Sequence, residues 1–375
     1  MDREPKEINW GRADPRRRVR AGRGAVSNPD GRFRRAYAES FDDGWESLAE
    51  DAADGAATKP KTELDVDHSR SVISYNRSPD IPFDRSINPY RGCEHGCIYC
   101  YARPTHAYLD LSPGLDFETR LQYKPDAPEQ LARELARPGY KPAPIALGVN
   151  TDAWQPVEKR LRLTRRILEV LWTYRHPVTV ITKSGLIERD LELLADLAAE
   201  NLVHASVTVT TLDGELNRAL EPRAAGPARR LRMIERLAAA GVPTGVMVAP
   251  VIPALNDGEL EAILMAAAER GARSAGYITL RLPHEVEPLF REWLEAHYPM
   301  RAEHVLSVVR QMHGGRQYDS RFGRRMRGSG PQAELIRERA RVARARLGLD
   351  RRLPPLDCTH FRVPARSGDQ LGLFE

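Results

Sequence analysis

Between about residues 85 and 285, short apolar runs alternate with longer stretches in which apolar residues recur every three or four positions. The short runs predict buried strands, and the longer stretches predict amphipathic helices. Strands are expected within residues 86–91, 143–150, 178–182, 203–210, 243–253 and 276–281. Helices are expected near residues 163–175, 191–200, 227–241 and 258–271.

This alternation predicts an α/β fold with a parallel sheet, because each strand is followed by a helix that returns the chain to the same end. The strands are almost continuously apolar, as expected when both faces of a sheet are covered. Six such units fit a partial (β/α)6 TIM-like barrel as well as an open doubly wound sheet, and periodicity alone does not choose between them.

Two helix boundaries carry local signals. Pro227 stands near the start of one predicted helix and Gly241 just after its end, the usual placement of these residues. Asn256 and Glu259 have the spacing of a capping box before the next helix.

The chain divides into four predicted parts. Residues 1–65 are polar, lack a sustained apolar period and predict a flexible leader. Residues 66–300 form the expected barrel, 301–350 a helical extension with basic faces, and 351–375 an extended tail.

Composition favours a cytoplasmic protein. The chain has 41% hydrophobic and 29% charged residues among 375, which is ordinary for a globular protein. It has neither a run of about 18 apolar residues, the length that predicts a membrane span, nor an apolar secretory signal at its start. Three of its four cysteines are clustered, and in a reducing compartment such a cluster favours metal binding over disulfides.

Charge is unevenly spread around a net value of +5. From Arg316 to Arg352 there are twelve arginines and four acids. Clustered arginine suits a phosphate-rich partner such as nucleic acid, although a solvated basic surface would look the same.

The clustered cysteines, Cys93, Cys97 and Cys100, have the spacing C-x3-C-x2-C. Structural zinc needs a fourth ligand, for which His95, His106 and Cys358 are the candidates. An iron–sulfur cluster held by three cysteines would instead leave one iron free to bind a co-substrate.

The stretch "INPYRGCEHGCIYCYARPTH", with Tyr99 before the last cysteine, resembles the radical S-adenosylmethionine (radical SAM) superfamily. The similarity is greatest to its spore photoproduct lyase-like branch, which includes a DNA repair enzyme, and it covers roughly residues 70–290. The motif lies where that family has it, in the loop after the first strand of a partial (β/α)6 barrel.

The resemblance implies a 4Fe–4S cluster on the three cysteines, with S-adenosylmethionine on the fourth iron. One electron from an external donor would cleave this co-substrate to methionine and a 5′-deoxyadenosyl radical, which abstracts hydrogen from a substrate. Gly92 and Gly96 would let the loop fold back around the cluster.

Polar residues near the carboxyl ends of the predicted strands, where a parallel βα fold places its ligands, are candidates for binding S-adenosylmethionine. A capping, packing or surface role is the alternative for each. The candidates are Tyr99, Asn150, Thr151, Asp152, Lys183, Ser184, Ser206, Thr208 and Arg223.

The sequence identifies no hydrogen-atom donor. The branch's founding lyase has an extra cysteine after its second strand, but this chain has Val149-Asn150-Thr151 there. Its fourth cysteine, Cys358, lies in the predicted tail.

The chain ends in a pattern that resembles the short peptide by which bacterial repair proteins bind the DNA sliding clamp. A flexible segment with two apolar anchors and an amide fits a preformed groove. The residues concerned are Gln370, Leu371, Leu373 and Phe374.

Together these features predict a radical SAM enzyme that acts on nucleic acid, with DNA favoured and a function like DNA repair. The alternatives are radical modification of tRNA or a peptide, and a non-enzymatic DNA-associated protein with a structural metal.

Overall fold

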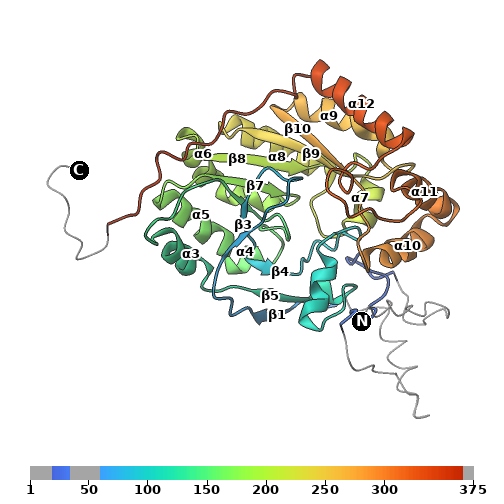
Figure 1. Ribbon diagram of the computed structural model, residues 1–375, viewed down its shortest axis with the longest axis horizontal. Coiled ribbons are helices and arrows are strands. Elements are labelled where there is room, and N and C mark those ends of the chain that lie inside the picture. The colour runs from blue at the N-terminus through green and yellow to red at the C-terminus, as the bar shows by residue number, and fades with distance from the viewer. Residues whose placement is uncertain (1–18, 34–59, 366–375) are drawn as a thin grey trace, which may run out of the picture.

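The computed structural model describes residues 19–33 and 60–365. Its centre is a seven-stranded sheet in the order β10-β9-β8-β7-β6-β3-β2 (Figure 1). The strands are β2 Ile73–Tyr75, β3 Arg85–Ile87, β6 Ile145–Leu147, β7 Val178–Thr182, β8 Val203–Thr208, β9 Thr244–Val251 and β10 Ser274–Thr279. All neighbours are parallel except β2 and β3.

The strand order decides between the two predicted architectures. From β3 to β10 the six parallel strands follow chain order across the sheet, whereas a doubly wound sheet reverses direction at a switch point. The prediction of a partial (β/α)6 barrel is therefore confirmed. The covering helices are α3 Ala127–Leu135, α4 Glu158–Leu161, α5 Leu163–Thr173, α6 Leu191–Ala199, α7 Gly214–Leu220, α8 Pro227–Ala239 and α9 Leu260–Ala268.

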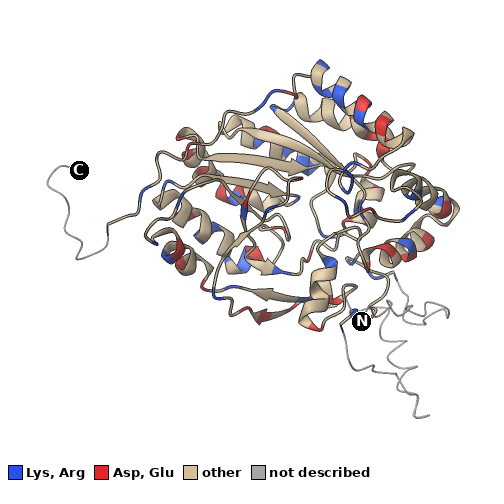
Figure 2. Cartoon of the chain, viewed as in Figure 1, with Lys and Arg blue, Asp and Glu red and all other residues tan. Residues whose placement is uncertain are grey.

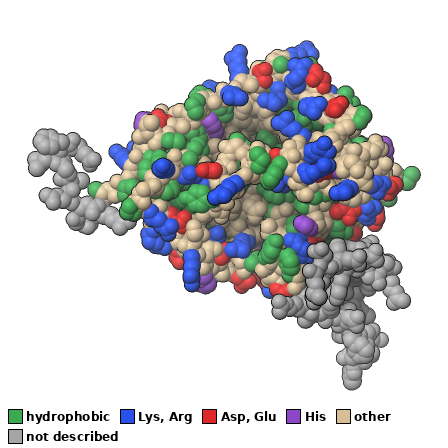
Figure 3. Space-filling model, viewed as in Figure 1, with side chains coloured by type: hydrophobic (Ala, Val, Ile, Leu, Met, Phe, Trp, Pro, Cys, Tyr) green, Lys and Arg blue, Asp and Glu red, His purple; other side chains and the backbone are tan. Residues whose placement is uncertain are grey.

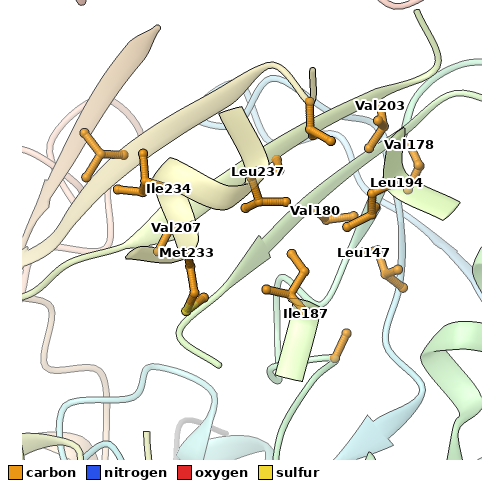
Figure 4. Packing of buried hydrophobic residues seen from close by; sticks show 14 of the residues in the cluster. Leu147, Val178, Val180, Ile187, Leu194, Val203, Val207, Met233, Ile234 and Leu237 are labelled. Carbon is orange, nitrogen blue, oxygen red and sulfur yellow. The ribbon is translucent and has the colours of Figure 1, made fainter. Parts of the chain in front are cut away.

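The main core lies between the sheet and these helices. Figure 4 shows Val178 and Val180 of β7 beside Leu194 of α6, and Met233 and Ile234 of α8 beside Val207 of β8. All of these side chains are buried. The alternate residues of each strand thus face the helices, and the remaining ones face the inside of the barrel.

A second, three-stranded sheet was not predicted. It has the order β1-β5-β4, with β1 Glu63–Val66, β4 Tyr90–Arg91 and β5 Arg120–Tyr123. Its strands are short and mostly polar, so they lack the apolar run that identifies the barrel strands. Since β4 directly precedes the cysteines, this sheet holds the base of their loop.

The carboxyl-terminal part is helical, as predicted, with α10 Val286–His297, α11 Pro299–Met312 and α12 Pro331–Arg346. The chain then runs extended past the amino ends of the strands (Figure 1). Backbone bonds join Ala275 to Leu349, Asp357 to Asn201 and Arg362 to Tyr174.

Two local predictions need correction. Residues 19–33 belong to the predicted flexible leader, but Ala25 and Val26 are buried against the α10 and α11 helices. The predicted capping box is also wrong, because the Asn256 amide binds the Ile252, Thr210 and Pro250 backbone instead.

Within the described residues, no helix combines the length and the apolar character needed to cross a membrane. The residues of the suggested clamp-binding peptide, 370–374, lie outside the described part of the chain.

Candidate active site

The cysteines lie on a loop between β4 and the 3-10 helix η1 (Arg103–Leu109). Gly92 and Gly96 have φ of +77° and +68°, the left-handed region that glycine adopts without strain. These φ values agree with a loop that turns at both glycines. Their role in folding the loop around a cluster stays a prediction.

The three thiols face the carboxyl ends of the barrel strands. Cys93 lies within electrostatic reach of Asp152 after β6, and Cys97 within reach of Lys183 after β7 and Glu221 after β8. Burial first, and then the neighbouring thiol of Cys97, raises the pKa of Cys93. The loop therefore lies at the mouth of the barrel. Among the described residues, no group of three or more His, Cys, Asp or Glu side chains is arranged to hold a metal ion.

A buried arginine holds the loop's backbone. Arg103 is fully buried, and its guanidinium donates to the carbonyl oxygens of Cys97 at 3.0 Å and Gly96 at 3.2 Å. It also donates to Glu118 Oε1 at 2.5 Å. Because a buried charge without a partner costs several kcal/mol, this pair fixes the loop between two elements of the fold.

Glu118 ties the amino-terminal segment to the same point. Its carboxylate accepts the backbone N–H groups of Gly24 at 3.0 Å and Ala25 at 2.8 Å. A Cβ atom added at Gly24 would lie 1.9 Å from the Gly96 carbonyl oxygen, so only glycine allows this approach. Residues 22–26 therefore cover the outside of the cysteine loop.

Asp152, a predicted cofactor residue, joins the ends of two strands. It accepts hydrogen bonds from Thr182 Oγ1 at 2.7 Å and from the N–H groups of Lys183 and Trp154 at 2.8 Å. One of its oxygens is 3.4 Å from His95 Nδ1. Burial lowers the pKa of this histidine, while the neighbouring Asp152 acts in the opposite direction.

The three candidates for a fourth metal ligand lie in different places. His95 faces Asp152, and His106 Nε2 is 2.9 Å from the Arg120 carbonyl oxygen. Cys358 is on the segment that passes the amino ends of the strands, near Asn201, at the opposite end of the barrel. These positions favour a loop with three cysteine ligands over a closed four-ligand site.

A buried glutamate that the sequence analysis missed organises the other side of the mouth. Glu221 accepts hydrogen bonds from Tyr99, from Thr210 at 2.6 Å and from Asn217 at 2.9 Å, and it pairs with Arg230. The predicted cofactor residue Lys183 has its Nζ 3.9 Å from the same carboxylate. Burial alone would raise the pKa of Glu221, but Arg230 and Lys183 lower it to about 2.

Two further candidates from the sequence lie on β8. Its odd-numbered residues Val203, Ala205 and Val207 face the helices, so Ser206 and Thr208 face the inside of the barrel. Arg230 fastens this strand, because its Nη1 donates to the Thr208 carbonyl oxygen at 3.0 Å.

The remaining candidates make structural contacts. Thr151 Oγ1 donates to the Tyr90 carbonyl oxygen, and the N–H of Asn150 donates to Asn88. The Ser184 hydroxyl caps the 3-10 helix η2 (Gly185–Asp190) by accepting from the Leu186 N–H. Arg223 lies 2.9 Å from Glu94 within the cysteine loop, with its side chain 30% exposed. The structure thus shows a structural contact for each of these residues, and their role in binding S-adenosylmethionine stays a prediction.

Comparison with known proteins agrees with this geometry. A model of the radical SAM superfamily matches residues 87–267, which contain the cysteine loop and four complete parallel strands of the barrel, β6 to β9. The uncharacterized protein Rv2578c of Mycobacterium tuberculosis is 36% identical over 291 residues, covering 76% of this chain and 82% of that protein. The chain belongs to the radical SAM superfamily. It is therefore an enzyme of that superfamily, as the resemblance of its cysteine motif implies.

More distant relatives share parts of the chain. The uncharacterized protein MJ0683 of Methanocaldococcus jannaschii is 27% identical over 173 residues, covering 46% of this chain and 62% of that protein. Among solved structures, spore photoproduct lyase complexed with dinucleoside spore photoproduct has a TM-score of 0.53 at 16% identity, covering 76% and 79% of the two chains. A mutant of that lyase with bound AdoMet and the same dinucleoside has the same TM-score at 15% identity, covering 76% and 78%. At this identity the likeness concerns the fold.

The buried Arg103–Glu118 pair predicts that two glutamate substitutions lower the free energy of unfolding by very different amounts. Glu118→Gln leaves the Arg103 charge buried without its ionic partner, so we expect the free energy of unfolding to fall by about 3–5 kcal/mol. Glu129→Gln removes the same type of partner from Arg166, but this glutamate is 51% exposed, and we expect a loss below about 1 kcal/mol. Urea denaturation of both variants measures the difference, and equal losses would contradict it.

Glu221 predicts a specific dependence of stability on pH. Since its folded pKa of about 2 lies below its ordinary value of 4.5, the ionised carboxylate stabilises the fold above about pH 4.5, and this contribution is lost as the pH falls toward 2. The difference in unfolding free energy between the native protein and Glu221→Gln should therefore shrink between pH 6 and pH 3. Urea titrations across this range test the trend, with exposed Glu235→Gln as the control; a difference that grows on acidification would contradict it.

Proposed function

We propose that this protein holds a 4Fe–4S cluster on Cys93, Cys97 and Cys100 and uses it with S-adenosylmethionine to modify or repair DNA. The observation that carries the proposal is the position of the three thiols on one glycine-shaped loop over the mouth of a parallel barrel. Thiolates are the ligands of such clusters, and three of them leave one iron for the co-substrate.

Cys93, Cys97 and Cys100 would hold the cluster, which would supply one-electron reduction of S-adenosylmethionine with an electron from an external donor. The residues of this chain bind and orient the co-substrate. Lys183, a cation with 16% of its side chain exposed, suits the methionine carboxylate, and Asp152 suits the amine. Arg223 is a second cation near the loop, but it is already paired with Glu94.

The inner face of β8 suits the nucleoside part of S-adenosylmethionine. The hydroxyls of Ser206 and Thr208 are positioned for the ribose, and Tyr99 offers an aromatic ring for adenine. Glu221 and Arg230 hold this wall rigid through the Tyr99 hydroxyl and the Thr208 carbonyl. Pre-organised groups of this kind keep the co-substrate oriented without rearrangement.

Protection from water is the second task of the protein. Residues 22–26 and the Arg103–Glu118 pair cover the outside of the cysteine loop. A covered loop keeps solvent away from reactive species formed at the mouth. Cys358 takes no part in this chemistry in our proposal, because it lies at the other end of the barrel.

Three features of different kinds support DNA as the substrate. The chain shares its fold with a lyase solved with a dinucleoside photoproduct. Arginine is concentrated between residues 316 and 352. The terminal residues 370–374 resemble a sliding-clamp peptide. Modification of tRNA or a peptide is the alternative that these features disfavour.

Two cysteine substitutions test the cluster. Anaerobically reconstituted protein should contain about four irons and cleave S-adenosylmethionine under dithionite, whereas Cys93→Ala should lose the cleavage. Cys358→Ala is the matched control and should retain iron and cleavage. Iron analysis, electron paramagnetic resonance and chromatography of 5′-deoxyadenosine provide the measurements. Normal cleavage by Cys93→Ala, or zinc in place of iron, would refute the cluster and favour a DNA-associated protein with a structural metal.

The terminal peptide predicts binding to the sliding clamp. Immobilised clamp should retain the full chain and release a variant that carries Leu373→Ala and Phe374→Ala, because both apolar anchors are then lost. Gly372→Ala leaves the anchors in place and serves as the control. Equal retention of the full chain and the double variant would remove this part of the argument for DNA.

A further inference from the structure

The link between α11 and α12, residues 313–330, spans the open side of the barrel; we call it the bridging segment. On one side Thr279, at the end of the last strand β10, donates its N–H and its hydroxyl to the Met326 carbonyl oxygen at 3.0 and 3.1 Å. On the other side Asp80, in the β2–β3 loop, accepts from the Gly323 N–H at 2.7 Å and from Arg325 Nε at 2.6 Å. Since β10 and β2 are opposite edges of the sheet, the segment connects the two borders of the opening.

The bridging segment carries exposed positive charge. Arg316, Arg324 and Arg327 are exposed and form no salt bridge among the described residues, although Arg324 lies within electrostatic reach of Asp319, which pairs with Arg321. By contrast, Arg339 on α12 pairs with Glu261, and Arg341 pairs with Glu338.

Charged side chains are also spread over the helix that follows. Figure 2 shows acidic and basic residues mixed along α12. In Figure 3, Lys and Arg side chains gather over the upper right of the face, where α12 lies in Figure 1. Arg346, at the end of α12, is exposed and forms no salt bridge among the described residues, so exposed positive charge continues from the bridging segment onto this helix.

An exposed aromatic ring lies among these arginines. Phe322 is 60% exposed, and the Arg325 guanidinium lies 4.7 Å from its ring centroid. Arg325 in turn is fixed by Asp80 and by Ser78, at 2.5 Å from its Nη2. A large apolar ring held in place at the surface is a platform on which a nucleic-acid base can stack.

This surface continues to the cysteine loop. Tyr101, directly after the third cysteine, is 44% exposed, and the Arg281 guanidinium lies 4.3 Å from its ring centroid. Arg281 follows β10, and both Arg281 and Arg325 lie within electrostatic reach of Tyr101. Aromatic and basic side chains therefore alternate from Phe322 to the mouth of the barrel.

We propose that the bridging segment is a docking surface for an unpaired strand, with phosphates on Arg324 and Arg327 and a base on Phe322, that leads this strand to the cysteine loop. The choice of DNA rests on the proposed function. The inference that the strand is unpaired rests on the exposed ring of Phe322. Base faces are hidden by stacking inside a duplex, so a solitary exposed ring can receive a base only from a strand that is locally open. Exposed arginines that form no salt bridge can direct their N–H groups to phosphate oxygens.

The test is binding of a fluorescent DNA strand of about 12 nucleotides to the reconstituted full chain, measured by anisotropy at several salt concentrations. The double variant Arg324→Glu with Arg327→Glu should bind at least about tenfold more weakly at 0.1 M salt, with the salt slope lowered by about two. Arg232→Glu with Arg273→Glu is the matched control: both residues are exposed, lie on α8 and before β10, and change the net charge equally.

A second variant separates stacking from charge. Phe322→Ala should weaken binding about five- to a hundredfold while leaving the salt slope unchanged. Native protein should also prefer the single strand to a duplex of the same sequence. Two results would overturn the docking surface. One is an equal loss of affinity in the two double variants. The other is equal affinity for strand and duplex together with unchanged binding by Phe322→Ala.

The same samples keep the two proposals apart. Iron content and S-adenosylmethionine cleavage by the native protein test the proposed function, and the arginine dependence of strand binding tests the surface. A protein that binds the strand through Arg324 and Arg327 but lacks cleavage supports the surface and refutes the function. Preference for an RNA strand through the same arginines supports the surface and refutes the choice of DNA.

Discussion

The arrangement around the cysteines depends on one buried ion pair, Arg103 with Glu118. The guanidinium holds two carbonyl oxygens of the cysteine loop, and the carboxylate holds two backbone N–H groups of the amino-terminal segment. Neither charge tolerates burial alone. The loop and its cover are therefore formed together, and the inorganic centre proposed here would be enclosed by the same contacts that shape its ligands.

The barrel adds the complementary half of the site. Its strands end at one level, so Asp152, Lys183 and Thr208 meet across the mouth although they are far apart in sequence. Glu221 and Arg230 then fix that wall from behind. The site thus has a rigid polar wall opposite a rigid thiol loop, which suits a reaction in which a small co-substrate must be held in one orientation.

Much of the fold follows from the sequence, because buried parallel strands are continuous apolar runs and their helices have one apolar face. The cysteine motif likewise marks its own loop, with Gly92 and Gly96 at the turns. The ion pairs could not be predicted: Glu118 and Glu221 are charged residues in polar stretches that resemble surface loops, and each finds its arginine only through the tertiary fold. The amino-terminal segment was missed for the same reason, since it is packed by backbone contacts with Glu118 rather than by an apolar pattern of its own.

The extended segment after α12 separates the two ends of the molecule. It passes Ala275, Asn201 and Tyr174 at the amino ends of the strands, so the chain leaves the barrel on the side away from the thiols. If the residues that follow bind a partner on DNA, as proposed, this binding would raise the local concentration of the enzyme on the DNA. The opening of the barrel beside the thiols would remain accessible to a substrate. Recruitment and chemistry can then occur at the same time, without one having to release the other.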